Sequence, residues 1–308
     1  MLQYYPDITL IKKQEIKIID KLIKEMTESI IKKLLPGGGF TNNENGSYRP
    51  DATSWAVNAF SSLNINDSSI HSASEKLKQT QMPDGRVTLQ KNQPQTCWPT
   101  PLAIMAWHNK KKFQDNQNKA VHFMLNFSGL HWEKRDFTAG HDTMIRGWPW
   151  IENTHSWVEP TAMAMIALEI ADKGNHTRSV EAKRMLLDRQ LSSGGWNYGN
   201  TTVFGQQLRP MLESTGMALN ALQRKVKRKA VQKSLDYLQN NIEQLKTPFS
   251  LGWGLLGLGS WGIEPADKPG LIVRCLRQQG IFGTYNTLQM SLLLVALIAQ
   301  KGLVDLIK

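Results

Sequence analysis

The stretch Gln190-Leu-Ser-Ser-Gly194-Gly-Trp196, followed about twenty residues later by Glu213-Ser-Thr215-Gly-Met-Ala218-Leu-Asn-Ala221, carries the strongest structural signal in the chain because both of its halves recur. The second half has the form Thr-x-x-Ala-x-x-Ala, and its copies begin at Thr53, Thr100, Thr161 and Thr215. The first half has the form Gln-x-x-x-Gly-x-aromatic, and it recurs at 279–285 and, more loosely, at 81–87 and 34–40. A unit that repeats along a chain indicates an architecture built from similar supersecondary units.

Each copy of the second half predicts a helix with one smooth face, since small residues at every third position let a neighbouring helix approach closely. The apolar spacing of residues 11–35 also predicts an amphipathic helix, with a lysine-rich polar face. We expect six helix pairs, with first members beginning near residues 13, 70, 117, 177, 230 and 268 and second members near 52, 100, 160, 213, 250 and 286. Such pairs close most simply into an all-α (α/α)6 toroid that forms one domain over residues 1–308.

Residues 251–262 depart from the pattern because they hold more glycines than a helix usually tolerates. This segment either lines or gates a central cavity, or it packs very closely against a neighbour.

In this unit one helix ends in a glutamine, a Gly-aromatic turn follows, and the second helix is rich in Thr, Ala and Leu. The unit resembles the repeat of the terpenoid cyclase and protein prenyltransferase superfamily, and most nearly that of its squalene–hopene cyclase-like members. The resemblance covers roughly residues 30 to 300. It implies a helical toroid, an isoprenoid or triterpenoid small molecule as partner, and peripheral contact with a membrane. A fold of this kind hosts several activities, so the site residues have to decide the function.

Composition restricts the class of protein. The hydrophobic content of 41% is ordinary for a globular chain. Two cysteines, Cys97 and Cys275, provide no disulfide framework and fit a reducing compartment. Residues 1–7 lack the basic and apolar segments of a secretory signal, and no run of about 18 apolar residues occurs. We therefore expect a cytoplasmic protein.

The net charge of +11, from 37 basic and 26 acidic residues, suits an anionic membrane surface or a phosphorylated substrate. Two basic runs, at 110–112 and 224–229, each follow a repeat helix, where they form a solvated rim and complement the helix end. No nucleic-acid-binding motif accompanies the charge, so no nucleic acid is expected. Only one domain's worth of repeats is present, so a membrane, a partner or a second copy of the chain, in a homo-oligomer, would help to enclose a long substrate.

The candidate site residues gather before the second helices, whose first turns rim one end of a toroid's cavity. Two residues before the repeat threonines stand Asp51, Trp98, Glu159 and Glu213, of which three are acids. The long turn of the third repeat adds Asp142 and His155. Further aromatic candidates for substrate contact are Trp148, Trp150, Trp157, Trp196 and Tyr198.

Two interpretations of the acids compete. In the structural one, an acid in the first helical turn interacts with free amides and the helix dipole, worth about 0.3–1 kcal/mol, and Pro160 after Glu159 fits such a first turn. In the catalytic one, an acid protonates an alkene or epoxide. Because these are weak bases, the acid must stay protonated at neutral pH, which burial in an apolar pocket achieves. The resulting carbocation is stabilised by aromatic faces.

The resemblance identifies one acid in particular. In squalene–hopene cyclase-like enzymes an Asp-x-Asp-Asp motif immediately precedes a repeat threonine, and here it falls on Arg49-Pro50-Asp51-Ala52 before Thr53. The central aspartate, which resembles the proton donor, is kept as Asp51, while Arg49 and Ala52 replace its flanking acids. An adjacent arginine favours an ionised carboxylate. Asp142 or Glu159, with His155 to orient it, is therefore the alternative donor.

Other chemistries are weighed by their motifs. The Asp-x-Cys zinc signature of the prenyltransferases does not occur, and neither a metal nor another cofactor is expected. The favoured function is a class II terpene cyclase or isomerase. Two alternatives stay open. One is a catalytically silent toroid that binds a lipid or a partner. The other is a glycosidase- or lyase-like toroid, in which two of Asp142, Glu159 and Glu213 flank the scissile bond and tryptophans stack on sugars.

Overall fold

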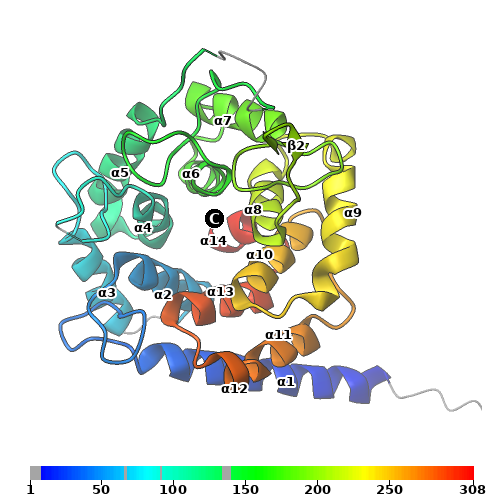
Figure 1. Cartoon of the computed structure of the whole chain (residues 1–308). Helices are drawn as coiled ribbons and strands as arrows, with labels where there is room; N and C mark the ends of the chain where they lie inside the picture. Colours follow the sequence, from blue (N-terminus) through cyan, green and yellow to red (C-terminus); the bar gives the residue numbers. More distant parts are fainter. Residues whose placement is uncertain (1–7, 66–67, 91, 134–139) are drawn as a thin grey trace, which may run out of the picture.

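The computed structural model describes residues 8–65, 68–90, 92–133 and 140–308, with side chains from residue 15 onward. Within these ranges, six helices form a closed inner ring in which each helix contacts the next and the last contacts the first (Figure 1). The ring helices are α2 (Pro50–Ser62), α4 (Pro99–Trp107), α6 (Val158–Ile170), α8 (Leu212–Leu222), α10 (Pro248–Gly259) and α13 (Thr287–Ile298).

An outer layer of helices alternates with the ring along the chain and packs on its outside. Its members are α1 (Ile8–Ile31), α3 (Ser68–Lys78), α5 (Gln114–Asn126), α7 (Thr177–Asp188), α9 (Gln232–Asn241) and α11 (Lys268–Arg277). The structure confirms the all-α (α/α)6 toroid, and the observed starts lie within about five residues of the expected ones.

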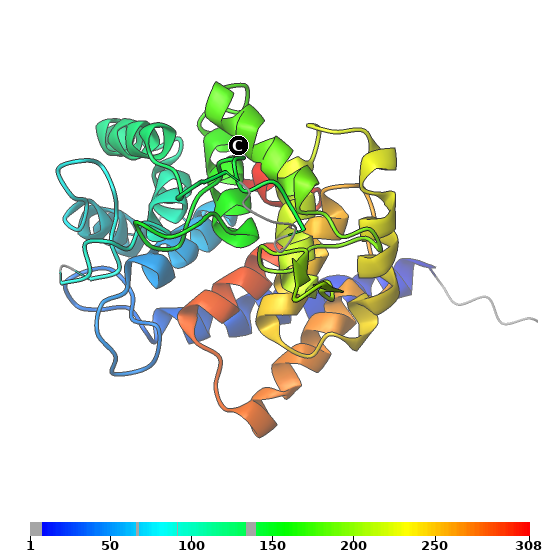
Figure 2. The same ribbon diagram turned by 45° about the horizontal axis from the view of Figure 1, so that its top comes forward.

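Short elements occupy the two ends of the ring. Helix α14 (Leu303–Ile307) contacts α2 and α6 and lies behind the centre of the ring in Figure 1. Helix α12 (Gln279–Phe282) projects away from the ring, as Figure 2 shows. A small hairpin of β1 (Thr202–Val203) and β2 (Gln206–Gln207) lies before α8. The 3-10 helices are Lys111–Phe113, Arg228–Ala230 and Ile242–Gln244.

The repeat threonines join each ring helix to the turn that precedes it. In four repeats the threonine Oγ1 accepts a hydrogen bond from the backbone N–H of a residue in the turn that precedes the ring helix. The pairs are Thr53 with Phe40 (2.9 Å), Thr100 with Val87 (3.0 Å), Thr161 with Trp148 (2.9 Å) and Thr215 with Trp196 (3.1 Å). In α13 the Thr287 hydroxyl instead donates to the carbonyl of Thr41 (2.6 Å), which links the last hairpin to the first.

The glycines of the turns are required by geometry. Gly85 and Gly194 have φ values of +97° and +95°, a region that other residues rarely adopt. A Cβ atom on them would lie 2.2 Å from the Lys119 carbonyl oxygen and 2.5 Å from that of Lys233, which belong to the next outer helices. Gln81 Nε2 donates to the carbonyl of Gly85 (2.9 Å) and closes the turn. The first half of the repeat is therefore a turn that packs against the following hairpin.

The glycine-rich segment forms helix α10 and packs very closely against α8. A Cβ atom on Gly216 would lie 2.2 Å from the Trp253 carbonyl oxygen, and one on Gly257 would lie 2.7 Å from the Gly216 Cα. Because the two backbones approach to this extent, neither position has room for a side chain. Residues 251–262 thus pack very closely against a neighbouring helix, which is one of the two alternatives expected from the sequence. Trp253 of this segment also lines a cavity inside the ring, which is described below.

Among the helices of the described ranges, none is long and apolar enough to cross a lipid bilayer.

Candidate functional site

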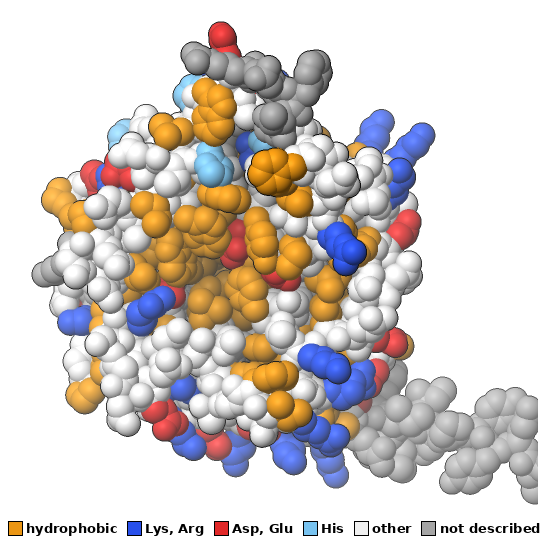
Figure 3. Space-filling model, viewed as in Figure 1, with side chains coloured by type: hydrophobic (Ala, Val, Ile, Leu, Met, Phe, Trp, Pro, Cys, Tyr) orange, Lys and Arg blue, Asp and Glu red, His pale blue; other side chains and the backbone are white. Residues whose placement is uncertain are grey.

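An apolar cavity opens near the N-terminal ends of the ring helices and contains about 50 Å³ of space that water could fill. Its walls come from α2, α4, α6, α10 and α13 and from residues just before α4 and α6. The lining residues are Trp55, Trp98, Leu102, Trp150, Glu159, Pro160, Met163, Phe249, Trp253 and Leu288. Figure 3 shows a hollow at the centre of this face, with mainly apolar walls and acidic atoms within it.

Glu159 places a carboxyl group at this apolar wall. It belongs to the first turn of α6 and follows the extended residue Trp157 by two positions. Burial and, to a smaller extent, the charge of Glu213 together raise the pKa of Glu159 from 4.5 to about 8. With a pKa of about 8, roughly nine in ten molecules carry a protonated Glu159 at pH 7. The group is therefore a neutral acid, able to give up a proton, beside tryptophan rings.

Glu213 occupies the matching position on the neighbouring helix α8 but has a polar partner. The Ser250 hydroxyl, in the first turn of α10, donates to Glu213 Oε2 (2.9 Å). Burial and then the Glu213 charge raise the pKa of Tyr198 and of Tyr237. Glu159 and Glu213 thus form two carboxyl groups at one end of the ring, in different environments.

Asp51 is 1% exposed and forms a bidentate ion pair with Arg49. Arg49 Nε donates to Asp51 Oδ1 (2.9 Å) and Arg49 Nη2 donates to Asp51 Oδ2 (2.7 Å). Both carboxyl oxygens of Asp51 therefore accept a charge-assisted hydrogen bond. Asp51 is also not among the residues that line the cavity. The structure therefore presents Asp51 as an ion-paired acceptor in the first turn of α2.

The third-repeat residues Asp142 and His155 lie away from Glu159's cavity. Asp142 is exposed, and its Oδ1 accepts from the backbone N–H of Met144 (2.9 Å), which is an Asx-type turn. The His155 ring packs on Trp157, with centroids 4.2 Å apart. Burial and, after it, the charge of the neighbouring Arg189 lower the pKa of His155.

His155 belongs to a second pocket, here called the hairpin pocket, of about 390 Å³. It lies between the third-repeat turn and the β1–β2 hairpin, and its lining is Leu130, Trp132, His141, Thr143, His155, Arg189, Asn200, Thr202, Val203 and Phe204. Arg189 is 4% exposed, and its Nη1 donates to the carbonyls of Ser156 (2.9 Å) and Gly199 (3.2 Å). Burial lowers the pKa of Arg189 to about 10, and its Nε has no hydrogen-bond partner in the described part of the chain. This pocket therefore has a buried cation in its wall.

Two of the aromatic candidates, Trp98 and Trp150, line the cavity and pack edge to face with centroids 5.8 Å apart. A second edge-to-face pair, Trp55 and Trp253 at 5.7 Å, lies in the same lining and was not expected from the sequence. The cavity is thus bordered by four indole rings.

The other aromatic candidates lie elsewhere. Trp148 and Trp196 are buried between ring and outer helices, where their Nε1 atoms donate to the carbonyls of Met124 (3.0 Å) and Leu186 (2.6 Å). Trp157 stacks beside His155, and Tyr198 is 46% exposed. The aromatic residue of the repeat therefore marks packing between helix layers, and none of these four is in the cavity lining.

Helix periodicity explains which residues reach the cavity. Trp98 and Leu102 are four residues apart, as are Glu159 and Met163, and residues at this spacing share one helix face. In the first repeat, the residue four positions after Asp51 is Trp55, which also lines the cavity. The position two residues after Thr53, Thr100 and Thr161 was thus a usable signal for cavity-facing side chains, although the matching Met217 of α8 is not in the lining.

Comparisons with known proteins identify the fold but no family. No protein-family model matches the chain, and no curated protein matches it in sequence. Solved structures do match. A variant of type II terpene cyclase MstE from Scytonema, in complex with geranylgeranyl dihydroxybenzoate as substrate, has a TM-score of 0.61 and 11% identity, over 96% of this chain and 99% of that chain. Another MstE variant, in complex with the product merosterolic acid A, has a TM-score of 0.64 and 10% identity, over 94% of this chain and 99% of that chain.

A carbohydrate enzyme matches equally well. The GH76A alpha-1,6-mannanase from Salegentibacter sp. HEL1_6 has a TM-score of 0.60 and 12% identity, over 94% of this chain and 99% of that chain. At such identities the likeness shows a shared (α/α)6 toroid fold. The function has to be argued from the side chains of the site.

Proposed function

We propose that the chain catalyses a proton-initiated cyclisation or isomerisation of an isoprenoid substrate, with Glu159 as the acid. One observation carries the proposal: a carboxyl group with a pKa of about 8 lies in the wall of a cavity bordered by four tryptophans. A carboxylic acid that is neutral at pH 7 can protonate an alkene or an epoxide, whereas an ionised one cannot.

The proposed reaction starts at the Glu159 O–H bond. The proton adds to one carbon of an alkene, whose π electrons form the new C–H bond, and leaves a carbocation on the neighbouring carbon and a carboxylate on Glu159. Further alkenes of the same chain attack the cation in turn and form ring bonds. Loss of a proton from the last cation gives a neutral product with the mass of the substrate. A proton from solvent then restores the acid.

The tryptophans act on the cations of this sequence. A cation within about 6 Å of an indole face is stabilised by roughly 2 kcal/mol or more when water is excluded. Trp55, Trp98, Trp150 and Trp253 form the two edge-to-face pairs of the lining. Leu102 and Leu288 add apolar surface without a nucleophile that could trap the cation.

The cavity has to widen to accept such a substrate. Its 50 Å³ of water-accessible space holds about four water molecules, whereas sites for drug-sized ligands span about 300–1,000 Å³. Phe249 and Leu288 are half-buried residues of the lining, in the first turns of α10 and α13. Their displacement would widen the cavity where it meets the surface.

The hairpin pocket offers a place for a polar end of the substrate. The MstE complex contains an isoprenoid chain joined to a dihydroxybenzoate. In the present chain, Arg189 would attract a carboxylate, and Trp132 and His155 would border an aromatic ring. His155 therefore suits binding of the substrate better than orientation of Glu159.

Contact with a membrane is part of the proposal. Ile281 and Phe282 on α12 are 74% and 68% exposed, and α12 projects from the ring in Figure 2. An exposed apolar pair on a projecting turn, on a chain of net charge +11, suits binding at an anionic lipid surface that also dissolves isoprenoids.

Hydrolysis of a glycoside is the second candidate. It is favoured by the two glutamates on adjacent ring helices and by the likeness to the mannanase. A carboxylic acid with a raised pKa and a second carboxyl group on the other side of the bond are the groups that glycosidases use. The mainly apolar lining of the cavity favours the isoprenoid, because sugars require many hydrogen-bond partners.

The two candidates are separated by incubating the purified chain with squalene, with a geranylgeranyl-substituted aromatic acid and with an alpha-1,6-mannan oligosaccharide. Mass spectrometry would follow the products in H₂O and in D₂O. We expect a cyclic product, isomeric with an isoprenoid substrate, that gains one deuterium in D₂O. Shortened oligosaccharides with unchanged isoprenoids would establish the second candidate instead.

Matched variants identify the acid. Glu159→Gln should lower the rate by about 10²–10⁴, the usual contribution of a general acid. Asp51→Asn should retain activity in the fraction of protein that is folded. If Glu159→Gln were active and Asp51→Asn inactive although folded, Glu159 would not be the acid and the site proposed here would be wrong.

A further inference from the structure

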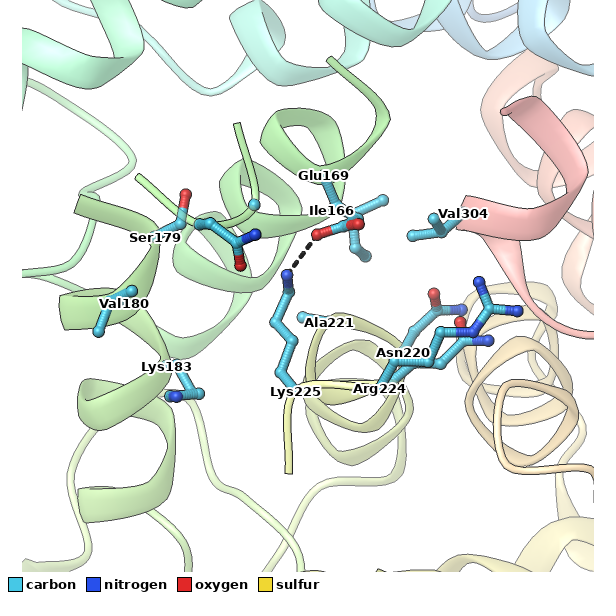
Figure 4. Close-up of a pocket in the computed structure, with 13 residues that line it drawn as sticks. Ile166, Glu169, Ser179, Val180, Lys183, Asn220, Ala221, Arg224, Lys225 and Val304 are labelled. Carbon is cyan, nitrogen blue, oxygen red and sulfur yellow. Dashed lines mark hydrogen bonds and ion pairs between the residues drawn. The ribbon is translucent and has the colours of Figure 1, made fainter. Parts of the chain in front are cut away.

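A polar pocket at the other end of the ring, here called the basal pocket, has no role in the proposed chemistry. It lies between α6, α7, the end of α8 and the helix α14, and its volume is about 260 Å³ (Figure 4). Glu169 in its wall follows Glu159 on α6 by ten residues, which corresponds to about 15 Å along the helix. The basal pocket is therefore separate from the cavity of the proposed reaction.

Asn220 is the residue of this pocket that favours a polar ligand. It is 0% exposed, yet neither its Nδ2 nor its Oδ1 has a hydrogen-bond partner among the described residues. Leaving a buried amide without partners costs about 1–3 kcal/mol per group. The position five residues after the repeat threonine is apolar in three other repeats, as Met105, Ile166 and Leu292, and in the first repeat it is Asn58, whose Nδ2 also has no hydrogen-bond partner among the described residues. An apolar residue would therefore suit the fold of α8 at least as well as Asn220 does.

The amide of Gln223, in the same wall, also has an oxygen atom that accepts no hydrogen bond from the described residues. Gln223 Nε2 donates to Asp305 Oδ2 (2.6 Å), while Gln223 Oε1 has no partner in the part of the chain that the structure describes. Figure 4 shows Asn220 near Arg224 on one side of the pocket. Two unsatisfied amide oxygens, Asn220 Oδ1 and Gln223 Oε1, call for an occupant that carries hydrogen-bond donors.

The charges of the pocket favour a negative occupant. Lys225 pairs with Glu169, and Arg224 pairs with Asp305 (2.8 Å). Lys183 lines the pocket and forms no ion pair with any described residue. Lys225 and Arg224 also follow the end of α8, where they complement the helix dipole. Lys183 lies within α7 and has no such role, so the pocket keeps a surplus positive charge.

The backbone at Arg224 supports the same assignment. Arg224 has φ +59°, and the residues at the ends of three other ring helices, Asn64, Asn109 and Asp172, have φ values of 55°, 55° and 58°. Asn and Asp adopt this left-handed conformation readily, whereas a long side chain such as arginine does so at a higher cost. An arginine here places a cation at the rim of the pocket.

We propose that the basal pocket binds a small hydroxylated anion, a carboxylate or a phosphate, of the size of a sugar acid. Its negative group lies between Lys183 and Arg224. Its hydroxyl groups donate to Asn220 Oδ1 and Gln223 Oε1, and one of them accepts from Asn220 Nδ2. Val304 of α14 lines the pocket, so that the occupant also contacts the helix that covers this end of the ring.

Calorimetric titration of the full chain tests the proposal with four probes: glucose 6-phosphate, gluconate, inorganic phosphate and glucose. We expect glucose 6-phosphate or gluconate to bind at least about tenfold more tightly than the last two, because only they combine a charge with several hydroxyl groups. Which of the two binds more tightly distinguishes a phosphate ligand from a carboxylate ligand. Absence of binding by all four would overturn the proposal and leave Asn220 solvated by water.

Variants link the binding to the named residues. Asn220→Leu and Lys183→Met should each weaken the preferred probe about tenfold or more. Asn220→Leu should fold with an unchanged or higher Tm, since it removes an unsatisfied amide. Asn58→Leu is the matched control, because Asn58 occupies the same repeat position on α2, is 2% exposed and is not in the pocket lining. Equal binding by Asn220→Leu and wild type would refute the assignment.

Discussion

The raised pKa of Glu159 predicts a specific pH dependence of stability. Because burial raises the pKa from 4.5 to about 8, the folded chain binds this proton more tightly than the unfolded chain does. This contribution to the free energy of unfolding is fully present below about pH 4.5 and is lost as the pH rises towards and through 8. At about 1.4 kcal/mol for each pKa unit, the loss reaches about 3 kcal/mol at pH 7 and about 5 kcal/mol at pH 9.

The substitution Glu159→Gln removes the titration but keeps the shape of the side chain. The variant should be close to wild type in stability at pH 5, and the difference in unfolding free energy should grow in its favour by about 4 kcal/mol between pH 5 and pH 9. Urea unfolding followed by far-ultraviolet circular dichroism at pH 5, 7 and 9 measures it. Glu25→Gln, at an exposed position of α1, is the control and should show no such trend.

A difference between wild type and Glu159→Gln that stayed constant, within about 1 kcal/mol, across this pH range would refute the reasoning. Glu159 would then be ionised in the folded state at neutral pH, and the proposed proton donor would be lost with it.

Three further predictions concern the frame around the site. Asp51→Asn leaves the guanidinium of Arg49 without its carboxylate, so the unfolding free energy should fall by about 2–3 kcal/mol in urea titrations, while the pH dependence due to Glu159 persists. Gly216→Ala forces a methyl group onto the Trp253 carbonyl, so that variant should lose several degrees of Tm and show altered tryptophan fluorescence; an unchanged Tm would mean that α8 and α10 do not pack as described. Thr161→Val removes the acceptor for the buried backbone N–H of Trp148. The free energy of unfolding should fall by about 1–3 kcal/mol, and the amide hydrogen of Trp148 should exchange faster.

Much of the fold could be predicted because the repeat encodes contacts that each hairpin makes in the same way. A threonine hydroxyl at a fixed position accepts from the preceding turn, and a glycine with positive φ touches the next outer helix. Both are local and periodic, so they are visible in one sequence. The positions at which the paired helices start could therefore be predicted to within about five residues.

The site was only partly predictable, because its properties depend on contacts between helices. Asp51 and Glu159 stand at equivalent positions two residues before a repeat threonine, yet one pairs with Arg49 and the other faces indole rings. Sequence reasoning named both and could not choose between them. Trp196 was singled out because it belongs to the repeat, but its indole packs between helix layers. Trp253 lies in a segment whose glycines hid its helical register.

The hydrogen bond from Thr287 to the Thr41 carbonyl has a consequence for how the molecule unfolds. In an open array of helical hairpins the two end units have a single neighbour each, and they fray first. Here the last ring helix contacts the first, so every hairpin has a neighbour on both sides and neither end of the array is exposed. Detaching any one hairpin from the ring therefore breaks two interfaces at once. The ring should therefore melt in a single cooperative transition, and deletion of one hairpin should destabilise all of the others together.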